Sequence, residues 1–417
     1  MLRCKKGFTL VEIIVVTLLF ILVIMAASSS FNVLLTQMAK LTKSEESNIE
    51  GVVGLEMLRH DLQQAGFGLP DAYMTAVAPT YTEATAVPAN RFNDAPSNLP
   101  RALAAGDNLA TVSVADAGVT YNILAGTDYL ALKGVPLGMN ETSQRWTYMP
   151  FDSGVTGLKK PRIWPTASLN LVNGDRVIMI KKSVVSGKAV NQMIYDVATP
   201  NIYWVNFNTA GFVDAFSPIA PDEVFYIYGI RPSGDLGMPF NRADYFVATP
   251  SATDRIPSYC APNTGILYKA TVNHADGALL PIPMLDCVAD MQLVFGWDLT
   301  DGMGNAGQDG VIDTWSSPVS AGGALTATPS VNLTLVQDAL GNPEKLRNSL
   351  KTVKVYLLAQ VGRRDPNYQS PASYVVGGAG ESSLTHTYDL TATSAMRNFH
   401  WKVYQLVVRP KNLMSNQ

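Results

Sequence analysis

The chain has 417 residues, of which 47% are hydrophobic and 16% are charged, and its formal net charge at pH 7 is −3. This balance is typical of a folded protein and excludes an intrinsically disordered chain or a strongly basic nucleic-acid-binding protein. The length allows two domains, although single β-rich domains of this size also occur.

The N-terminal segment combines a basic start with a long apolar run. Arginine and lysine residues precede Gly7, and an apolar stretch then extends from Phe8 to Met25. Its length suits a helix that spans a bilayer, and the positive charges before it are expected to stay cytoplasmic. The alternative is a secretory signal cleaved near Ala26-Ala27-Ser28, but such signals have a shorter apolar core and rarely hold a charge such as Glu12.

The stretch Lys5-Lys6-Gly7-Phe8-Thr9-Leu10-Val11-Glu12 resembles the signal of type IV prepilins. The resemblance implies that a prepilin peptidase cuts between Gly7 and Phe8, that Phe8 becomes an N-methylated first residue, and that the apolar helix stays in the mature chain. It also implies that Glu12 pairs with the amino terminus of an adjacent subunit during filament assembly.

The chemistry of Glu12 independently suggests a role. A carboxylate in a bilayer costs about 2.5 to 3.5 kcal/mol even on lenient insertion scales, so such a residue usually has a partner and a function. The alternative is that Glu12 lies close enough to the headgroups to stay hydrated, which would leave it without a role in assembly.

Helical periodicity continues to about Ala65. Apolar residues from Ile49 onward fall largely at helical spacing, with charged residues on the other faces. Gly51 and Gly54 each weaken a helix by roughly 1 kcal/mol relative to alanine, so a bend or local melting is possible there. Glycines and a proline from Gly66 onward predict the end of the helix.

The rest of the chain predicts a β-rich head. Residues 70–109 are rich in Ala, Pro, Asn and Thr with little periodicity, which predicts a long surface excursion. Short β-patterned runs separated by turn residues follow, and these favour antiparallel sheet over βαβ units. The expected elements are strands at 110–114, 129–133, 176–182, 193–197, 203–208, 223–230, 245–248, 265–272, 290–297, 352–360 and 400–408, a hairpin turn at Ser186-Gly187 and a short helix at 343–350.

Several segments resemble the PilW-like family of minor type IV pilins. They are Cys260 to Tyr268, Leu285 to Gln292, Leu350 to Gln360 and Trp401 to Asn412. The fold that this resemblance implies is α+β, with a long N-terminal helix packed on an antiparallel β-rich head. We therefore expect a leader over 1–7, a pilin helix over 8–66 with its membrane span at 8–27, and a head over 67–417.

The three cysteines are expected on different sides of the membrane. Cys4 lies in the predicted leader, whereas Cys260 and Cys287 would lie outside the membrane, where disulfides persist. The PilW-like resemblance implies that Cys260 and Cys287 are bridged. The alternative is two buried free thiols.

The resemblance also implies a structural assembly protein, which helps to start the pilus and can sit at its tip. The implied partners are other major and minor pilins, the prepilin peptidase, the inner-membrane assembly platform and the membrane, with no nucleic acid evident. The implied location is a single inner-membrane span with an exported head, and the pilus or cell surface after assembly. The alternatives are a pseudopilin of a type II secretion system, which shares Glu12 and the signal, a pilus-tip adhesin, and most remotely a tethered surface enzyme.

Motifs for catalysis are missing from the sequence, so we expect no enzymatic activity and no cofactor. An acidic loop over 301–313 partly matches a calcium loop, with Asn305, Asp309 and Asp313 at ligand positions one, five and nine. Gly307 and Ser316 stand where further oxygen ligands are needed. A solvated turn between strands is therefore the preferred interpretation of this weak calcium candidate.

Overall fold

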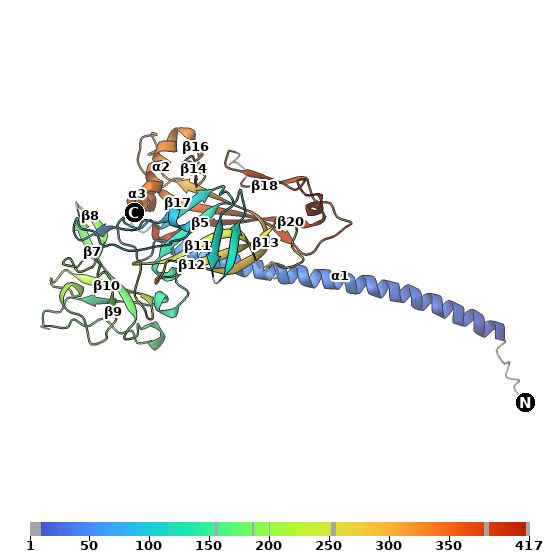
Figure 1. The fold of residues 1–417 in the computed structure, drawn as a ribbon, viewed down its shortest axis with the longest axis horizontal. Helices are drawn as coiled ribbons and strands as arrows, with labels where there is room; N and C mark the ends of the chain where they lie inside the picture. The colour runs from blue at the N-terminus through green and yellow to red at the C-terminus, as the bar shows by residue number, and fades with distance from the viewer. Residues whose placement is uncertain are drawn as a thin grey trace, which may run out of the picture.

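The computed structural model describes residues 10–116, 118–154, 157–185, 187–199, 201–251, 256–378 and 383–413. A long N-terminal helix joins a large, mostly antiparallel β-rich head, so the α+β class is confirmed (Figure 1). Gly7 and Phe8, the predicted cleavage site, lie outside the described residues, as do Cys4 in the predicted leader and Ser186 in the predicted hairpin turn.

The helix α1 (Leu10–Gln64) has 55 residues. Its N-terminal part projects away from the head and its C-terminal part lies against it (Figure 1). The helix is continuous through Gly51 and Gly54 in the structure. It ends as predicted, because Gly66 adopts a φ of +85°, which few residues other than glycine tolerate.

The larger sheet forms the body of the head and has 12 strands in the described chain, all paired antiparallel except β15 with β2. Its central order is β2-β5-β11-β12-β13-β17-β20. The strands are β2 (Leu103–Asp107), β3 (Ser113–Asp116), β4 (Val119–Ile123), β5 (Tyr129–Gly134), β11 (Asn241–Pro250), β12 (Gly265–Val272), β13 (Leu279–Trp297), β14 (Thr314–Ser316), β15 (Val319–Ser320), β16 (Ala327–Thr328), β17 (Leu350–Val361) and β20 (His400–Val408).

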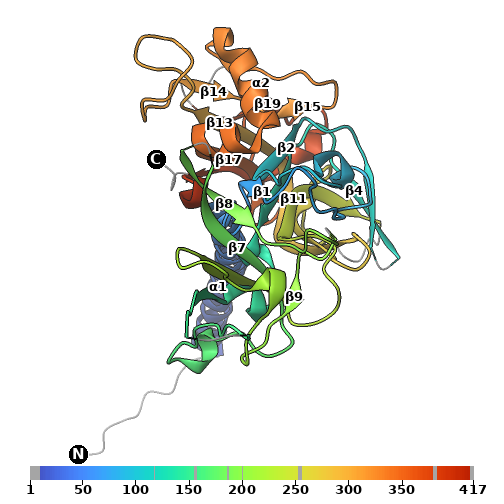
Figure 2. The same ribbon diagram turned by 90° about the vertical axis from the view of Figure 1, so that its left-hand side faces the viewer.

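A smaller sheet lies at the end of the molecule opposite the N-terminal part of α1 (Figure 1). Figure 2 views this end, with β7 and β9 toward the reader and α1 behind them. The six strands are ordered β1-β8-β7-β10-β6, with β9 beside β7. They are β1 (Ala72–Tyr73), β6 (Trp146–Pro150), β7 (Arg176–Val185), β8 (Lys188–Met193), β9 (Val205–Asn206) and β10 (Val224–Arg231).

Two helices and a hairpin in the described chain also belong to the head. The helices α2 (Leu333–Gly341) and α3 (Pro343–Ser349) precede β17, and a separate hairpin consists of β18 (Ser373–Val376) and β19 (His386–Asp389). The α3 helix confirms the helix predicted at 343–350, whereas α2 was not predicted. The segment Leu333–Gly341 has too few helical turns for a periodic pattern of apolar residues to be recognised in the sequence.

One continuous hydrophobic core joins α1, the larger sheet and one face of the smaller sheet. It includes Leu58 and Leu62 of α1, Leu267 of β12 and Ile180 of β7. A second cluster, around Phe225, covers the opposite face of the smaller sheet. Three large aromatic residues of the larger sheet, Trp297, Tyr356 and Trp401, are buried, and Tyr404 is partly buried.

Most predicted strands are confirmed, and those at 265–272 and 400–408 match β12 and β20 in full. The strand predicted at 193–197 is wrong, because β8 begins directly after the turn at Gly187 and ends at Met193. The strand predicted at 110–114 overlaps only the start of β3. The edge strand β6 was not predicted.

The prediction of a surface excursion over 70–109 is wrong. The segment contains β1 and β2, and it buries both apolar Tyr81 and charged Glu83 and Asp94. These side chains enter the core from turns and short irregular pieces, so the segment has neither helical nor strand periodicity. The absence of a periodic hydrophobic pattern in residues 70–109 therefore did not indicate that their side chains are exposed to solvent.

Candidate functional site

The membrane-length part of α1 is uncovered. Residues Leu10–Phe31 form the one helix in the described chain that is long and apolar enough to cross a membrane. Phe20 is 65% exposed and Val23 is 64% exposed. The hydroxyls of Thr17 and Ser29 each donate to a helix carbonyl at 2.9 Å, so both are satisfied without water. Apolar surface of this extent requires lipid or neighbouring helices to cover it.

Glu12 lies in the first turn of this uncovered part. A carboxylate there faces the positive end of the helix dipole, which favours it by about 0.3 to 1 kcal/mol at an exposed site. Glu12 is thus in the N-terminal part of α1, and Figure 1 shows this part projecting away from the head. The processing residues Gly7 and Phe8 lie outside the described residues.

The last part of α1 is built into the head. Leu58, Leu62 and Ala65 are fully buried, as their helical spacing predicts. Gly54 lies so close to β13 that a Cβ atom there would be 2.3 Å from the Met284 carbonyl oxygen. Close approach to the sheet is therefore the reason for a glycine in this helix.

A buried ion pair also fixes α1 to the head. The Asp61 carboxylate Oδ2 lies 2.6 Å from Lys269 Nζ on β12 and accepts a hydrogen bond of 2.7 Å from the Tyr245 hydroxyl on β11. Burial and the nearby Asp61 charge raise the pKa of Tyr245 well above its usual value, so its hydroxyl stays protonated. These contacts tie the helix to the sheet.

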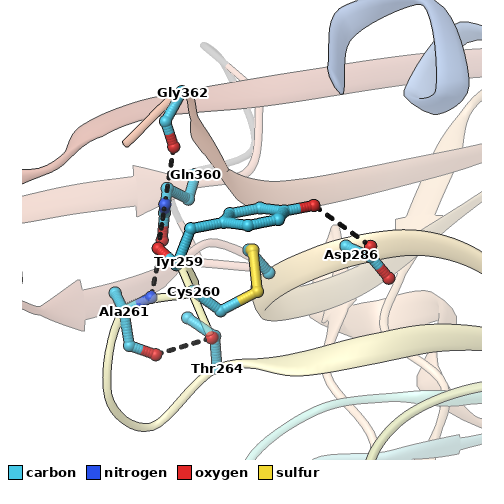
Figure 3. The surroundings of a disulfide bond; sticks show 8 residues. Tyr259, Cys260, Ala261, Thr264, Asp286, Gln360 and Gly362 are labelled. Atoms are coloured by element: carbon cyan, nitrogen blue, oxygen red, sulfur yellow. Dashed lines mark hydrogen bonds between the residues drawn. A yellow bond between two sulfur atoms is a disulfide. The ribbon is translucent and has the colours of Figure 1, made fainter. Parts of the chain in front are cut away.

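The predicted disulfide is present. Cys260 and Cys287 are bonded, with their Cα atoms 5.0 Å apart (Figure 3). Cys287 has a φ of +55° and lies where the register between β12 and β13 shifts. The bridge thus joins the turn before β12 to an irregular point of β13.

Gln360 of β17 braces the turn that holds Cys260, and sequence analysis did not identify this role. Its Oε1 accepts from Ala261 N at 2.6 Å, while its Nε2 donates to Tyr259 O at 2.9 Å and to Gly362 O at 2.7 Å (Figure 3). The sequence offered one indication of this role: Gln360 is a polar residue at the end of a predicted strand, in a segment that resembles PilW-like proteins.

A second buried network holds residues 70–109 on the larger sheet. Lys133 Nζ of β5 lies 2.7 Å from Glu83 Oε2 and 2.6 Å from Asp94 Oδ2. Arg242 of β11 donates to Glu83 at 2.9 Å and to Asp244 through two hydrogen bonds of 2.8 Å. Arg101 Nε lies 2.6 Å from Asp94 Oδ1, so three cations face three carboxylates. The charges are thus matched and hydrogen-bonded, as buried charges must be, and we assign this network to stability.

The calcium candidate residues each hydrogen-bond to neighbouring groups in or beside the acidic loop. Asp313 Oδ2 accepts from Leu299 N and from both N and Oγ1 of Thr300 at 2.8 to 3.0 Å. Asp309 Oδ1 accepts from Val311 N at 2.9 Å. The Asn305 amide nitrogen donates to Asp301 at 3.1 Å. Among the described residues, no group of three or more His, Cys, Asp or Glu side chains has an arrangement that could hold a metal ion.

A histidine and carboxylate cluster, which sequence analysis missed, joins the β18–β19 hairpin to the larger sheet. His386 Nδ1 lies 2.6 Å from Asp290 Oδ2 on β13. This hydrogen bond raises the pKa of His386 above its usual value, against the effect of partial burial. Asp128 lies nearby, and burial together with Asp107 raises the pKa of its carboxyl well above the usual value.

Comparisons of the chain with protein-family models, curated proteins and solved structures find no match.

Proposed function

We propose that this chain is a minor type IV pilin, a membrane-anchored subunit that takes part in assembly of the pilus. The observation that carries the proposal is α1. One unbroken helix has a bare, apolar N-terminal part with Glu12 in its first turn and a C-terminal part fixed into the head by Gly54 and Asp61.

This division of α1 suits a filament subunit better than a simple anchor. A membrane anchor needs apolar residues alone, and a carboxylate within it costs about 2.5 to 3.5 kcal/mol on insertion scales. The α-amino group of an adjacent subunit, exposed by cleavage after Gly7, would offset that cost when helices pack together. A stiff link between anchor and head also suits a subunit whose head must keep a fixed position in a filament.

The disulfide supports an exported head. Cys260 and Cys287 are bonded, and such bridges persist in oxidising compartments such as the bacterial periplasm or cell surface. The proposed location is a single inner-membrane span with the head on the far side, followed by the pilus after assembly. The proposed partners are other pilins, the prepilin peptidase and the inner-membrane assembly platform.

Processing is the first test. N-terminal mass analysis of the membrane-extracted protein should give a chain that begins at a methylated Phe8. A mature terminus near Ser29, or an uncleaved Met1, would falsify the proposal.

Assembly is the second test. Glu12→Ala should leave cleavage and head folding intact, because both depend on other groups, while reducing the amount of this protein in sheared pili relative to membranes. Thr17→Val, a change within the same span, is the matched control and should assemble normally. Normal incorporation of Glu12→Ala would contradict a role in assembly. Loss of type II secretion with intact pili, after deletion of the gene, would identify a pseudopilin instead.

A further inference from the structure

A group of aromatic side chains lies at the edge strand of the smaller sheet, with Trp146 exposed and Tyr148 and Trp164 half-buried. Trp146 and Tyr148 alternate along β6 and therefore share one face. Trp164, from the loop after β6, packs edge-to-face with both, with ring centroids 5.4 Å from Trp146 and 6.0 Å from Tyr148. Trp146 is 40% exposed even though it is a large aromatic residue. We name Trp146, Tyr148 and Trp164 the aromatic strip.

The aromatic strip is held rigidly. Trp164 is fixed by Asn170, whose side chain accepts from Trp164 N at 2.7 Å and donates to Trp164 O at 2.9 Å. The indole Nε1 of Trp164 donates to Trp146 O at 2.8 Å. The backbone of β6 pairs with β10 on one side, and Tyr148 O accepts from Arg162 N at 2.8 Å on the other. Little side-chain entropy remains to be lost when a ligand binds.

Polar groups border the aromatic strip. Trp146 also lines a cleft of about 190 Å³ that it shares with Gln64, Gln144 and Arg145. On the other side, Tyr226 of β10 is the register partner of Tyr148. Lys182 Nζ lies 5.8 Å from the Tyr226 ring. Aromatic surface thus adjoins polar side chains, among them Gln64, Gln144 and Lys182.

We propose that the aromatic strip binds pyranose sugar rings of an oligosaccharide. The face of an aromatic ring is electron-rich, and the axial C–H groups of a pyranose present a flat, weakly positive surface that packs on it. The ring hydroxyls then face the polar border. A rigid aromatic surface with a few convergent polar groups is the usual composition of a small-ligand site.

The pairing of Arg145 disfavours a nucleic acid at the strip. Single-stranded nucleic acids also stack on aromatic rings, but they require a positively charged groove that follows the phosphates. Here Arg145 is paired with Glu141 at 2.6 Å, and its Nε donates to Ser168 O at 3.0 Å. This binding function is independent of pilus assembly, and the smaller sheet lies opposite the N-terminal part of α1, so the strip is well placed to meet a ligand (Figure 1).

Glycan binding by the full-length protein is the test, in a detergent without a sugar headgroup. An array of gluco-, galacto- and mannopyranosyl oligosaccharides and their N-acetylated forms is screened, and hits are titrated by tryptophan fluorescence. We expect Trp164→Ala and Trp146→Ala to weaken binding at least tenfold. Trp315→Ala, a partly exposed tryptophan of the larger sheet, is the matched control and should bind normally.

A further variant keeps the test decisive if an alanine substitution impairs folding of the protein. Trp164→Phe retains a flat ring without the indole N–H. This variant replaces Trp164→Ala if the alanine variant fails to melt cooperatively. Trp164→Phe should weaken glycan binding less than Trp146→Ala does. Absence of array binding by the wild-type protein would overturn the proposal, as would equal binding by Trp146→Ala. Salt-sensitive binding of a 20-nucleotide oligo(dT) without glycan binding would overturn it in favour of a nucleic acid.

Discussion

Gly54 of α1 and Met284 of β13 are in direct backbone contact, since a Cβ atom on Gly54 would stand 2.3 Å from the Met284 carbonyl oxygen. Glycine inside a helix is unfavourable by about 1 kcal/mol relative to alanine. At this position the close approach of helix and sheet outweighs that preference.

Gly54→Ala should therefore destabilise the protein, whereas an alanine substitution in an open helix is neutral or stabilising. Met284 lies in the part of β13 that pairs with β12, which limits its ability to move away. Chemical denaturation in detergent is the measurement. Gly341→Ala is the control, because a Cβ on Gly341 meets nothing within 4 Å, and it should be neutral or gain up to about 1 kcal/mol. A Gly54→Ala variant as stable as the wild type would contradict the contact.

Asp61→Asn should lower the free energy of unfolding by about 3 to 5 kcal/mol, because it leaves the buried Lys269 ammonium without a counter-charge. Adding Lys269→Met to this variant should recover part of the loss. Glu56→Gln, on the same helix, breaks only the exposed pair with Arg59 and should cost at most about 1 kcal/mol. Urea titrations of the three variants measure these free energies of unfolding. Equal decreases for Asp61→Asn and Glu56→Gln would rule out a structural role for the buried pair.

Reduction of the Cys260–Cys287 bridge should lower the free energy of unfolding by about 3 to 4 kcal/mol in the chain-entropy model, given the sequence separation of 27. The melting temperature with and without reductant measures the effect. The double variant Cys260→Ala/Cys287→Ala is the control and should not respond to reductant. Alkylation of both cysteines in the denatured, non-reduced protein would show that the bridge does not form.

The β18–β19 hairpin should be more firmly attached at low pH. The pKa of His386 is raised in the folded state by its hydrogen bond to Asp290. The stabilisation is therefore fully present below the unfolded pKa of about 6.5 and is lost as pH rises through the higher folded pKa. Asp107 and Tyr388 also face this imidazole.

Hydrogen exchange of the β18–β19 amides from pH 6 to pH 8.5 measures that attachment, after correction for the intrinsic exchange rate. Protection should fall across this range in the wild type and stay flat in His386→Gln. His400→Gln, at the start of β20, is the control and should behave as the wild type does. A wild-type profile that is flat, or that rises with pH, would exclude the proposed charge pairing.

The elements with regular hydrophobic patterns were predictable from the sequence. The strands β12 and β20 have the predicted bounds, and Leu58 and Leu62 of α1 are buried as their helical spacing indicated. These residues reach the core through regular backbone, so their period is visible along the chain.

Features that depend on distant parts of the chain were not predictable in this way. Glu83 is buried because Lys133 and Arg242 approach it from other strands, and Gln360 holds a turn almost a hundred residues earlier in the chain. Contacts between residues that are far apart in the chain produce no periodic pattern in the local sequence. The position of Trp164 against Trp146 likewise depends on a loop whose course the sequence pattern does not determine.

The unbroken course of α1 sets the direction in which the head faces. An α-helix turns about 100° and rises about 1.5 Å per residue, so residues 32–53 form a stiff spacer of about 33 Å between the membrane-length segment and the contact at Gly54. Removing one residue from this spacer would swing the head by about 100° around the helix axis relative to Glu12. Removing seven would draw the head about 10 Å closer and leave its azimuth nearly unchanged. The orientation of the aromatic strip relative to Glu12 is therefore encoded in the number of residues between Glu12 and Gly54.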